Sequence, residues 1–129
     1  MKLKVGMYVR IKWGNGLQTI SQCKNIVDMG DTQYAKEDFY IHTDHSGEVI
    51  YKTMIVKSSF NIIDLVECGD YVNGYKVSLR GYDYADFVQC DYPVENGTTN
   101  HYKFYEQAIK SIVTKEQFSS MEYRLGDNK

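Results

Sequence analysis

The stretch HTDH at residues 42–45 is the part of this sequence that most resembles a metal-binding motif. His42, Asp44 and His45 supply imidazole and carboxylate groups at short spacing, and zinc accepts both kinds of ligand. A hydrolytic metal centre needs further ligands from other loops, and His101 is the one remaining histidine. The same residues also read as a polar turn between DFYIH and EVIYK, since Asp, Ser and Gly favour turns. We therefore predict neither a metal site nor a bound cofactor.

Motifs for covalent or phosphate chemistry are also missing from the sequence. There is no G-x-S-x-G nucleophile elbow, no G-x-x-x-x-G-K-[ST] phosphate loop and no G-x-G-x-x-G dinucleotide motif. GNG at residues 14–16 is typical of a turn. These observations favour a protein that is not an enzyme.

Tyrosine is the most unusual feature of the composition, at 12 of 129 residues. A buried phenol needs a hydrogen-bond partner, so a domain of this size cannot bury all of them, and exposed tyrosines suit binding surfaces. The best candidate surface is RGYDYADF at residues 80–87, with Tyr82, Asp83, Tyr84 and Asp86 as partner-binding residues. Strand periodicity predicts that Tyr82, Tyr84 and Asp86 share one face. The alternative is an ordinary ladder of cross-strand tyrosines.

The charge, −2 in total, is unevenly distributed. Residues 1–24 hold five bases and no acid, whereas residues 64–95 hold seven acids and two bases. Such segregation can orient a charged partner or let copies of the chain associate head to tail. The basic end suggests an alternative nucleic-acid-binding surface, although a pI near 5.9 is low for a dedicated nucleic-acid binder. Its residues would be Lys4, Arg10, Lys12 and Trp13.

The elements that would position these residues are mainly antiparallel strands. Asn-Gly occurs at residues 15–16, 73–74 and 96–97, and this dipeptide is the strongest short-range signal for a hairpin. Segments of alternating polarity, rich in Tyr, Val and Ile, lie around these turns, and we expect strands at residues 7–13, 48–56, 74–79, 85–92 and 108–113.

A short signal occurs twice, as Gly6-Met7-Tyr8-Val9 and as Gly69-Asp70-Tyr71-Val72, each followed by Asn-Gly. A tight turn, a strand and a hairpin commonly begin small SH3-like barrels. We therefore predict two antiparallel SH3-like modules, residues 1–60 and 61–129, packed together because each alone would bury little apolar surface. One compact domain is the alternative.

Helix is predicted in one place, TKEQFSSMEY at residues 114–123, where Thr114 and Gln117 fit a capping box. MEYRL, residues 121–125, would be either the end of this helix or a closing strand. QYAKEDFY, residues 33–40, fits a helical turn or an edge strand equally well.

The cysteines and the hydropathy pattern bear on the compartment. Cys23, Cys68 and Cys90 form no C-x-x-C pair, so we expect reduced and mostly buried thiols. No apolar run is long enough to cross a bilayer, and Met1 to Lys4 lead into a strand-like pattern without an apolar signal segment. We expect a cytoplasmic protein with no membrane contact.

Two longer strings carry a resemblance to known proteins: NIIDLVECGDYVNGYKV (61–77) and AIKSIVTKEQFSSMEYRL (108–125). They resemble recurring blocks in small phage and prophage proteins of low-GC Gram-positive bacteria, and residues 5–14 are similar to the VGDYVRTKYG-like stretch that often precedes those blocks. The resemblance covers about half the chain. It departs from the usual pattern at Met7, where Asp is common, and at Cys68, where Val is usual.

The resemblance implies a genetic setting, since such proteins are mostly of unknown function and small phage accessory proteins often counter host defences by stoichiometric binding. Together with the missing catalytic motifs, it leads us to expect a non-enzymatic protein that binds and blocks a host protein in the host cytoplasm. An example would be an anti-CRISPR-type inhibitor of a nucleic-acid-guided defence effector. The alternatives are a nucleic-acid-binding small-barrel module and a sponge that sequesters a nucleotide signal between subunits.

Overall fold

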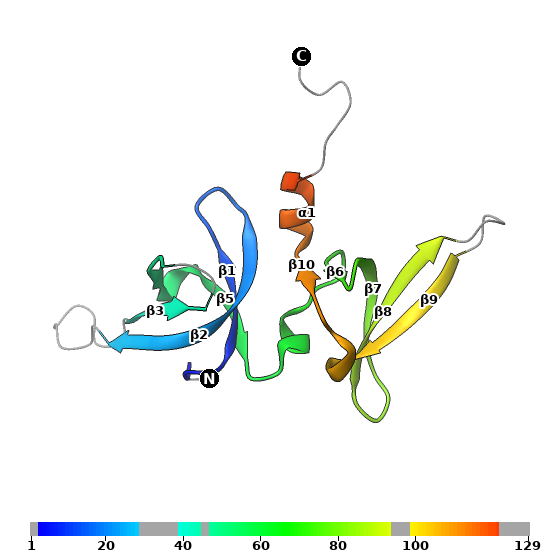
Figure 1. Ribbon diagram of the computed structural model, residues 1–129, viewed down its shortest axis with the longest axis horizontal. Helices are drawn as coiled ribbons and strands as arrows, with labels where there is room; N and C mark the ends of the chain where they lie inside the picture. Colours follow the sequence, from blue (N-terminus) through cyan, green and yellow to red (C-terminus); the bar gives the residue numbers. More distant parts are fainter. Residues whose placement is uncertain (1–2, 29–38, 45–46, 94–98, 122–129) are drawn as a thin grey trace, which may run out of the picture. The chain divides into compact units, whose positions relative to one another are not determined.

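The computed structural model describes residues 3–28, 39–44, 47–93 and 99–121, and it divides the chain into two compact units (Figure 1). The first unit is Met1–Leu65 and the second is Val66–Lys129. Each contains a five-stranded antiparallel sheet, and the described residues hold one α-helix near their C-terminal end. The predicted fold class, mainly β with two antiparallel modules and a short C-terminal helix, is confirmed.

The first unit is a curled sheet in the order β4-β3-β2-β1-β5. The long strand β2 pairs with β1 through its first half and with β3 through its second half, so the sheet bends along β2. Residues 48–56 do not form the single strand that we expected, because a 3₁₀ turn, η1, separates β4 from β5. The bounds are β1 Tyr8–Lys12, β2 Gln18–Asp28, β3 Phe39–Thr43, β4 Ile50–Tyr51, η1 Lys52–Met54, β5 Ile55–Ser59 and η2 Ile62–Leu65.

Five side chains from four strands form the core of the first unit: Val9, Ile11, Cys23, Ile41 and Ile50, none of them accessible to solvent. Val9 and Ile11 alternate along β1, as the period of a strand requires. Partly buried side chains, including Trp13 and Phe39, pack against this cluster.

The second unit has the sheet order β10-β6-β7-β8-β9. A 3₁₀ turn, η3, again separates the fourth strand of the unit from the fifth. Residues 108–113, expected as one strand, instead hold the end of this turn and the two-residue strand β10. The bounds are β6 Tyr71–Val72, β7 Tyr75–Tyr82, β8 Asp86–Pro93, β9 Thr99–Tyr105, η3 Glu106–Ala108, β10 Ile112–Val113 and α1 Lys115–Met121.

Both units therefore have one connectivity: within each, the first strand lies between the second and the fifth, and a 3₁₀ turn precedes the fifth. This connectivity is that of SH3-like barrels. SH3-like folds serve many unrelated functions, so the fold alone assigns none.

The repeated Gly-x-Tyr-Val signal makes the same backbone turn in each unit. In the first, Gly6 has a φ of 97°, a left-handed value that favours glycine. Met7 N–H donates to the carbonyl of Lys4 at 3.1 Å, and Gly6 N–H donates to the carbonyl of Cys23 at 2.9 Å. The backbone N–H of Lys4 also points at Met7 Sδ, 3.4 Å away.

In the second unit the corresponding residues form corresponding bonds. Gly69 has a φ of 96° and donates its N–H to the carbonyl of Val77 at 2.9 Å. Asp70 N–H donates to the carbonyl of Glu67 at 3.0 Å, and the Asp70 carboxylate accepts from Glu67 N–H at 2.8 Å. The four-residue pattern of the sequence therefore marks one structural device used twice.

Two of the three Asn-Gly pairs lie in the described residues. Both are at hairpins, but their turns differ in type. Asn73 and Gly74 have φ values of 54° and 87°, as a two-residue type I′ turn requires, so that Val72 pairs with Tyr75. In the first unit only Gly16 of the pair has a positive φ, at 89°. Its N–H donates to the Trp13 carbonyl at 2.9 Å. The loop runs from Lys12 at the end of β1 to Gln18 at the start of β2 and is longer than a two-residue type I′ turn. The third pair, Asn96-Gly97, lies outside the described residues.

The predicted capping box at the start of α1 is confirmed. Gln117 N–H donates to Thr114 Oγ1 at 3.1 Å, and Thr114 N–H donates to Gln117 Oε1 at 3.0 Å. The buried carboxylate of Asp70 adds a third contact by accepting the N–H of Lys115 at 2.9 Å. The part of MEYRL that follows Met121 lies outside the described residues. So do residues 33–38 of QYAKEDFY, whereas its last two residues, Phe39 and Tyr40, begin β3.

The three cysteines are free thiols, with Cys23 and Cys90 buried and Cys68 exposed. Burial raises the pKa of Cys23, and it raises that of Cys90 to about 11 with a further contribution from the negative charge of Asp91. In the described residues no helix is long and apolar enough to cross a membrane.

We expect one thiol of the native protein to react rapidly with Ellman's reagent at pH 8, and three after unfolding in urea. The reagent is attacked by thiolate, and Cys90, with a pKa of about 11, stays protonated at this pH and shielded from solvent. Absorbance at the thionitrobenzoate band counts the thiols, and Cys68→Ser should remove the rapid phase. Rapid reaction of all three thiols in the native protein would contradict the burial of Cys23 and Cys90.

Candidate partner-binding hairpin

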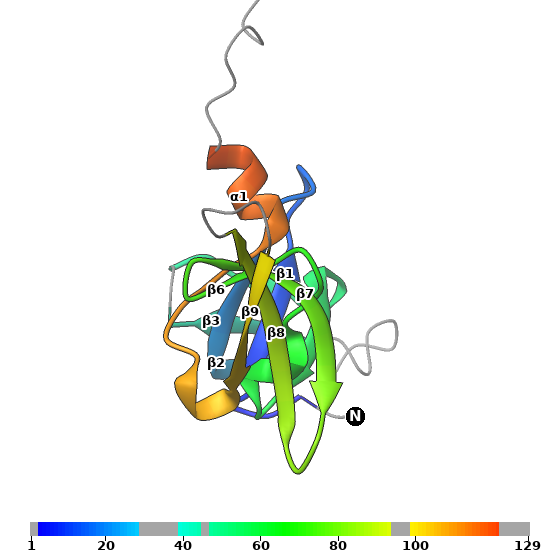
Figure 2. The ribbon, with the colours of Figure 1, turned by 90° about the vertical axis from the view of Figure 1, so that its right-hand side faces the viewer.

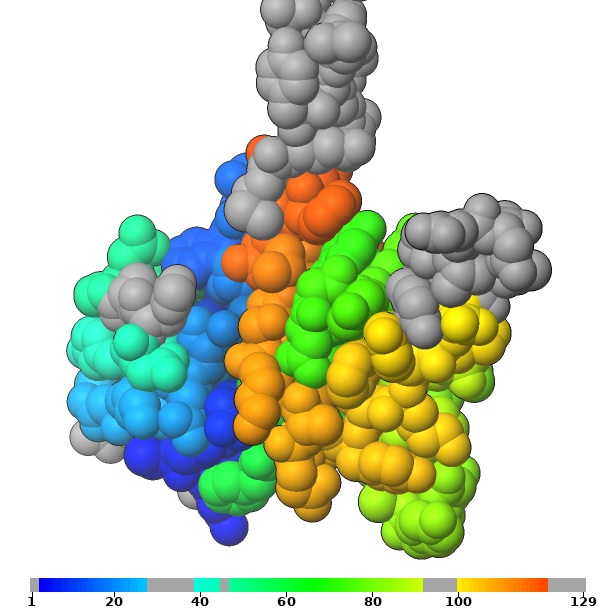
Figure 3. Space-filling view, turned by 45° about the vertical axis from the view of Figure 1, so that its right-hand side comes forward, coloured from blue at the N-terminus to red at the C-terminus, as the bar shows by residue number. Residues whose placement is uncertain are grey.

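The β7–β8 hairpin of the second unit ends in two solvent-exposed tyrosines. Tyr82 is the last residue of β7 and is 71% exposed, whereas Tyr84 lies in the loop and is 88% exposed. Figure 2 shows the hairpin as a ribbon that ends in a tight loop, and Figure 3 shows its yellow-green end protruding beyond β9. We call residues 82–86 the hairpin tip.

The predicted arrangement on one strand face holds for Tyr82 and Asp86, since directly opposed residues of an antiparallel pair share a face, and is wrong for Tyr84, which lies in the turn. Tyr82 pairs with Asp86 across the hairpin, and Asp83 N–H donates to the carbonyl of Ala85 at 3.2 Å, so the chain reverses between them. The period of two applies along a continuous strand and is lost in a turn. The tip still gathers all four predicted residues, with Tyr82 and Asp86 opposite each other and Tyr84 at the apex.

Asp83 ties the tip to the neighbouring strand β9. Its Oδ2 accepts a hydrogen bond from Lys103 Nζ at 3.0 Å and another from the Tyr105 hydroxyl at 2.9 Å, and Oδ1 accepts the backbone N–H of Tyr84. The bond from Lys103 lowers the pKa of Asp83 most, followed by the bond from Tyr105. Because this pKa is depressed on folding, the contacts are present above the ordinary aspartate pKa and are lost as the pH falls through the folded value.

A second support lies one residue pair further from the apex, where Gly81 faces Phe87. A Cβ atom at Gly81 would come within 2.3 Å of the Phe87 ring, so the ring lies directly over the glycine backbone. Tyr105 meets the Phe87 ring edge-on at a centroid distance of 6.1 Å, and Lys103 Nζ lies 4.3 Å from the ring centroid. The same two β9 side chains therefore hold both Asp83 and Phe87.

The acidic groups of the tip have cationic neighbours. Asp83 pairs with Lys103, and Asp86 lies 3.9 Å from the guanidinium of Arg80. The tip therefore offers exposed aromatic area beside paired charges, and its chemistry is more aromatic than acidic.

The alternative nucleic-acid residues do not form one open basic face. Lys4 and Lys12 are exposed, but Arg10 has no exposed surface. Arg10 Nε donates to Gln18 Oε1 at 2.6 Å, and Nη1 donates to the carbonyl of Leu65 at 3.0 Å. Its guanidinium is thus a structural link within the first unit, a role that strand parity could not predict because Leu65 lies 55 residues away in the chain.

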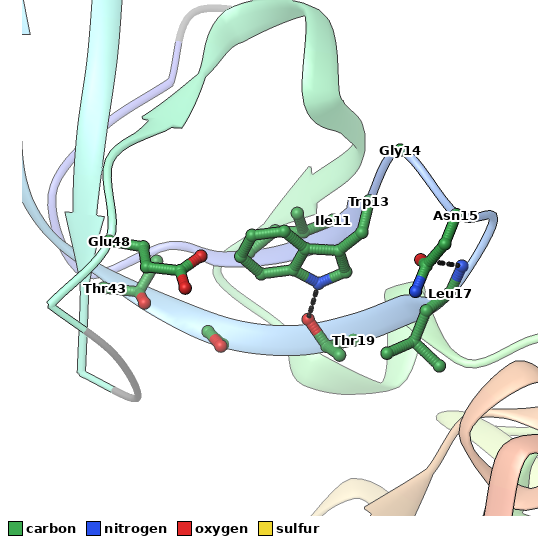
Figure 4. Close-up of a pocket in the computed structure, with 9 residues that line it drawn as sticks. Ile11, Trp13, Gly14, Asn15, Leu17, Thr19, Thr43 and Glu48 are labelled. Atoms are coloured by element: carbon green, nitrogen blue, oxygen red, sulfur yellow. Dashed lines mark hydrogen bonds between the residues drawn. The ribbon is translucent and has the colours of Figure 1, made fainter.

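The fourth of these residues, Trp13, lines a cleft in the first unit (Figure 4). Its indole Nε1–H donates to Thr19 Oγ1 at 3.0 Å, and Glu48 lies across the cleft from the ring. No sequence pattern that we used indicated this cleft, since Glu48 and Trp13 come from segments separated by two strands.

One side-chain cluster resembles a hydrolase triad in composition but not in order. Asp91 Oδ1 accepts the Ser78 hydroxyl at 3.0 Å and lies 2.6 Å from His101 Nδ1. The carboxylate thus stands between serine and imidazole, whereas a nucleophilic serine must bond to the imidazole that takes its proton. Of HTDH, His42 meets the Tyr40 ring edge-on with the ring centroids 5.7 Å apart, and His45 lies outside the described residues. The described residues contain no group of three His, Cys, Asp or Glu side chains that could hold a metal ion.

Comparisons with protein-family models, with curated proteins and with solved structures gave no match to this chain. The SH3-like description therefore rests on the strand order alone.

Proposed function

We propose that this protein acts by binding, with the hairpin tip as the surface that contacts a host protein. The observation that carries the proposal is the pair Tyr82 and Tyr84, the two most exposed of the large hydrophobic side chains in the described part of the chain. Tyrosine provides rigid amphipathic contact area at a low cost in conformational entropy, and it is enriched among the residues that dominate interface energetics.

The support of the tip by β9 strengthens this proposal. Side-chain and loop ordering on binding opposes association, so a surface that is already ordered binds more tightly. Asp83, Lys103 and Tyr105 fix the base of the loop before a partner arrives. The two tyrosines therefore project from a preorganised hairpin.

The partner class follows from the resemblance to phage and prophage accessory proteins. We propose a stoichiometric inhibitor of a host component, with a nucleic-acid-guided defence effector as the leading candidate. Since the charges of the tip are paired, the partner is expected to offer an apolar or aromatic-lined pocket more than a strongly basic groove.

The test is an affinity pull-down of tagged protein from host lysate with nuclease added, followed by affinity measurement with the captured partner. Tyr82→Ser/Tyr84→Ser is expected to weaken binding at least about tenfold, because hot-spot truncations cost about 2 kcal/mol or more. Tyr51→Ser, which removes a tyrosine that is 52% exposed in the first unit, serves as the matched control and should bind normally. Equal binding by the double variant would remove the tip from the interface, and enrichment that nuclease abolishes would favour the nucleic-acid alternative.

A further inference from the structure

The cleft beside Trp13 in the first unit has a volume of about 460 Å³, within the range of ligand-binding pockets. It is lined by Ile11, Trp13, Gly14, Asn15, Leu17, Thr19, Ser21, Thr43 and Glu48. We propose that this cleft binds an arginine side chain of a protein partner, stacked on Trp13 and paired with Glu48. The site lies in the first unit and is independent of the hairpin tip.

The indole is held in place by its own hydrogen bond. Because Trp13 Nε1 already donates to Thr19 Oγ1, the ring has no need of a ligand acceptor, and its orientation is set before binding. Trp13 also packs against the core cluster of the first unit while remaining partly exposed. The cleft thus has one fixed aromatic wall, and the face of an indole attracts cations more strongly than that of other aromatic rings.

Charge complementarity identifies the occupant as cationic. Glu48 is the one charged side chain among the nine residues that line the cleft, and Figure 4 shows its carboxylate turned toward the six-membered ring of Trp13. A cation stacked on the indole would therefore lie beside a carboxylate. An anionic ligand would meet this carboxylate at the same wall of the cleft.

The shape of the polar lining favours arginine over lysine. Hydroxyls of Thr19, Ser21 and Thr43 line the same cleft and can accept hydrogen bonds. A guanidinium is planar, stacks on aromatic rings and carries five donors, whereas an ammonium is a compact point charge with three. The partly exposed side chain of Leu17 offers apolar surface to the methylene stem.

The experiment uses the full chain and the peptide acetyl-Gly-Arg-Gly-amide. Trp13 is the single tryptophan, so its fluorescence reports directly on the cleft, and isothermal calorimetry gives a second readout. We expect a saturable fluorescence change with a dissociation constant of about 1 mM, as for one well-placed side chain. The citrulline peptide, which has the same shape without the charge, and the lysine peptide should both bind more weakly.

Glu48→Gln is expected to weaken arginine-peptide binding about threefold to tenfold, and Glu48→Lys to abolish it. Glu106→Gln, the same substitution in the second unit, is the matched control and should leave the affinity unchanged. Equal affinity for the arginine and citrulline peptides would overturn the proposal, as would unchanged binding by Glu48→Lys or the absence of both signals at 10 mM, about ten times the expected constant. None of these outcomes depends on the hairpin tip.

Discussion

Asp70→Ala is expected to lower the free energy of unfolding by about 3 kcal/mol, as removal of a buried, doubly hydrogen-bonded carboxylate does. Asp70 has no exposed surface, and its two oxygens accept the N–H groups of Glu67 and Lys115 at 2.8 and 2.9 Å. One bond adds a side-chain contact to the turn before β6, which main-chain bonds already close, and the other satisfies an N–H group in the first turn of α1. Truncation would leave both donors without this partner.

Urea unfolding followed by circular dichroism measures this loss, and amide hydrogen exchange locates it. The amides of Glu67 and Lys115 should lose protection in Asp70→Ala, while those of β2 in the first unit should not. Asp86→Ala removes the same charge from an exposed position with a long 3.9 Å ion pair, and it should change stability by less than about 0.5 kcal/mol. If Asp70→Ala were as mild as this control, the carboxylate would not be holding the helix.

Gly81→Val is expected to destabilise the second unit by about 1 to 3 kcal/mol and to weaken partner binding without altering either exposed tyrosine. The Phe87 ring occupies the space that a side chain at Gly81 needs, with ring atoms 2.3 to 2.8 Å from the site of a Cβ atom. Phe87 would have to move, and its contacts with Tyr105 and Lys103 would move with it. The tip would then lose part of its preorganisation.

The matched control is Gly47→Ala, since a Cβ atom there meets nothing within 4 Å and the backbone is not left-handed. It should change the urea midpoint very little. For Gly81→Val, the nuclear magnetic resonance signals of Phe87 and Tyr105 should shift, and the affinity for the captured partner should fall. Preserved stability together with preserved ring signals would show that the ring does not lie over residue 81 in solution.

The elements of this fold were predictable where a local pattern determines them. The capping box of Thr114 and Gln117 and the type I′ turn at Asn73-Gly74 depend on residues within three positions of each other, and both are present. The duplicated glycine turn is equally local, and it led to the two-module description. The prediction of one strand over residues 48–56 was wrong, because the 3₁₀ turn η1 separates β4 from β5 there. Alternating polarity alone does not show where a chain turns to start the next strand.

The candidate site was predicted in its residues but not in its geometry. Exposure of Tyr82 and Tyr84 follows from an excess of tyrosine, whereas their position at a chain reversal depends on Asp83 and its partners on β9. The buried position of Arg10 was not predicted for the same reason. The backbone carbonyl of Leu65, which accepts its hydrogen bond, is 55 residues away in the chain and becomes a neighbour only after folding. The cleft at Trp13 and Glu48 is likewise a product of tertiary structure.

The matching turns at Gly6 and Gly69 have a consequence for how the two units can diverge. In both, main-chain bonds make the turn, so the side chain that follows the glycine is not needed to close it. Met7 fills this position in the first unit with a buried thioether that faces the Lys4 N–H of its own turn, whereas Asp70 fills it in the second with a carboxylate that also anchors a helix. The repeat thus preserves a scaffold and leaves one position in each copy open to specialisation, through which a helix could be attached to one copy without rebuilding the barrel.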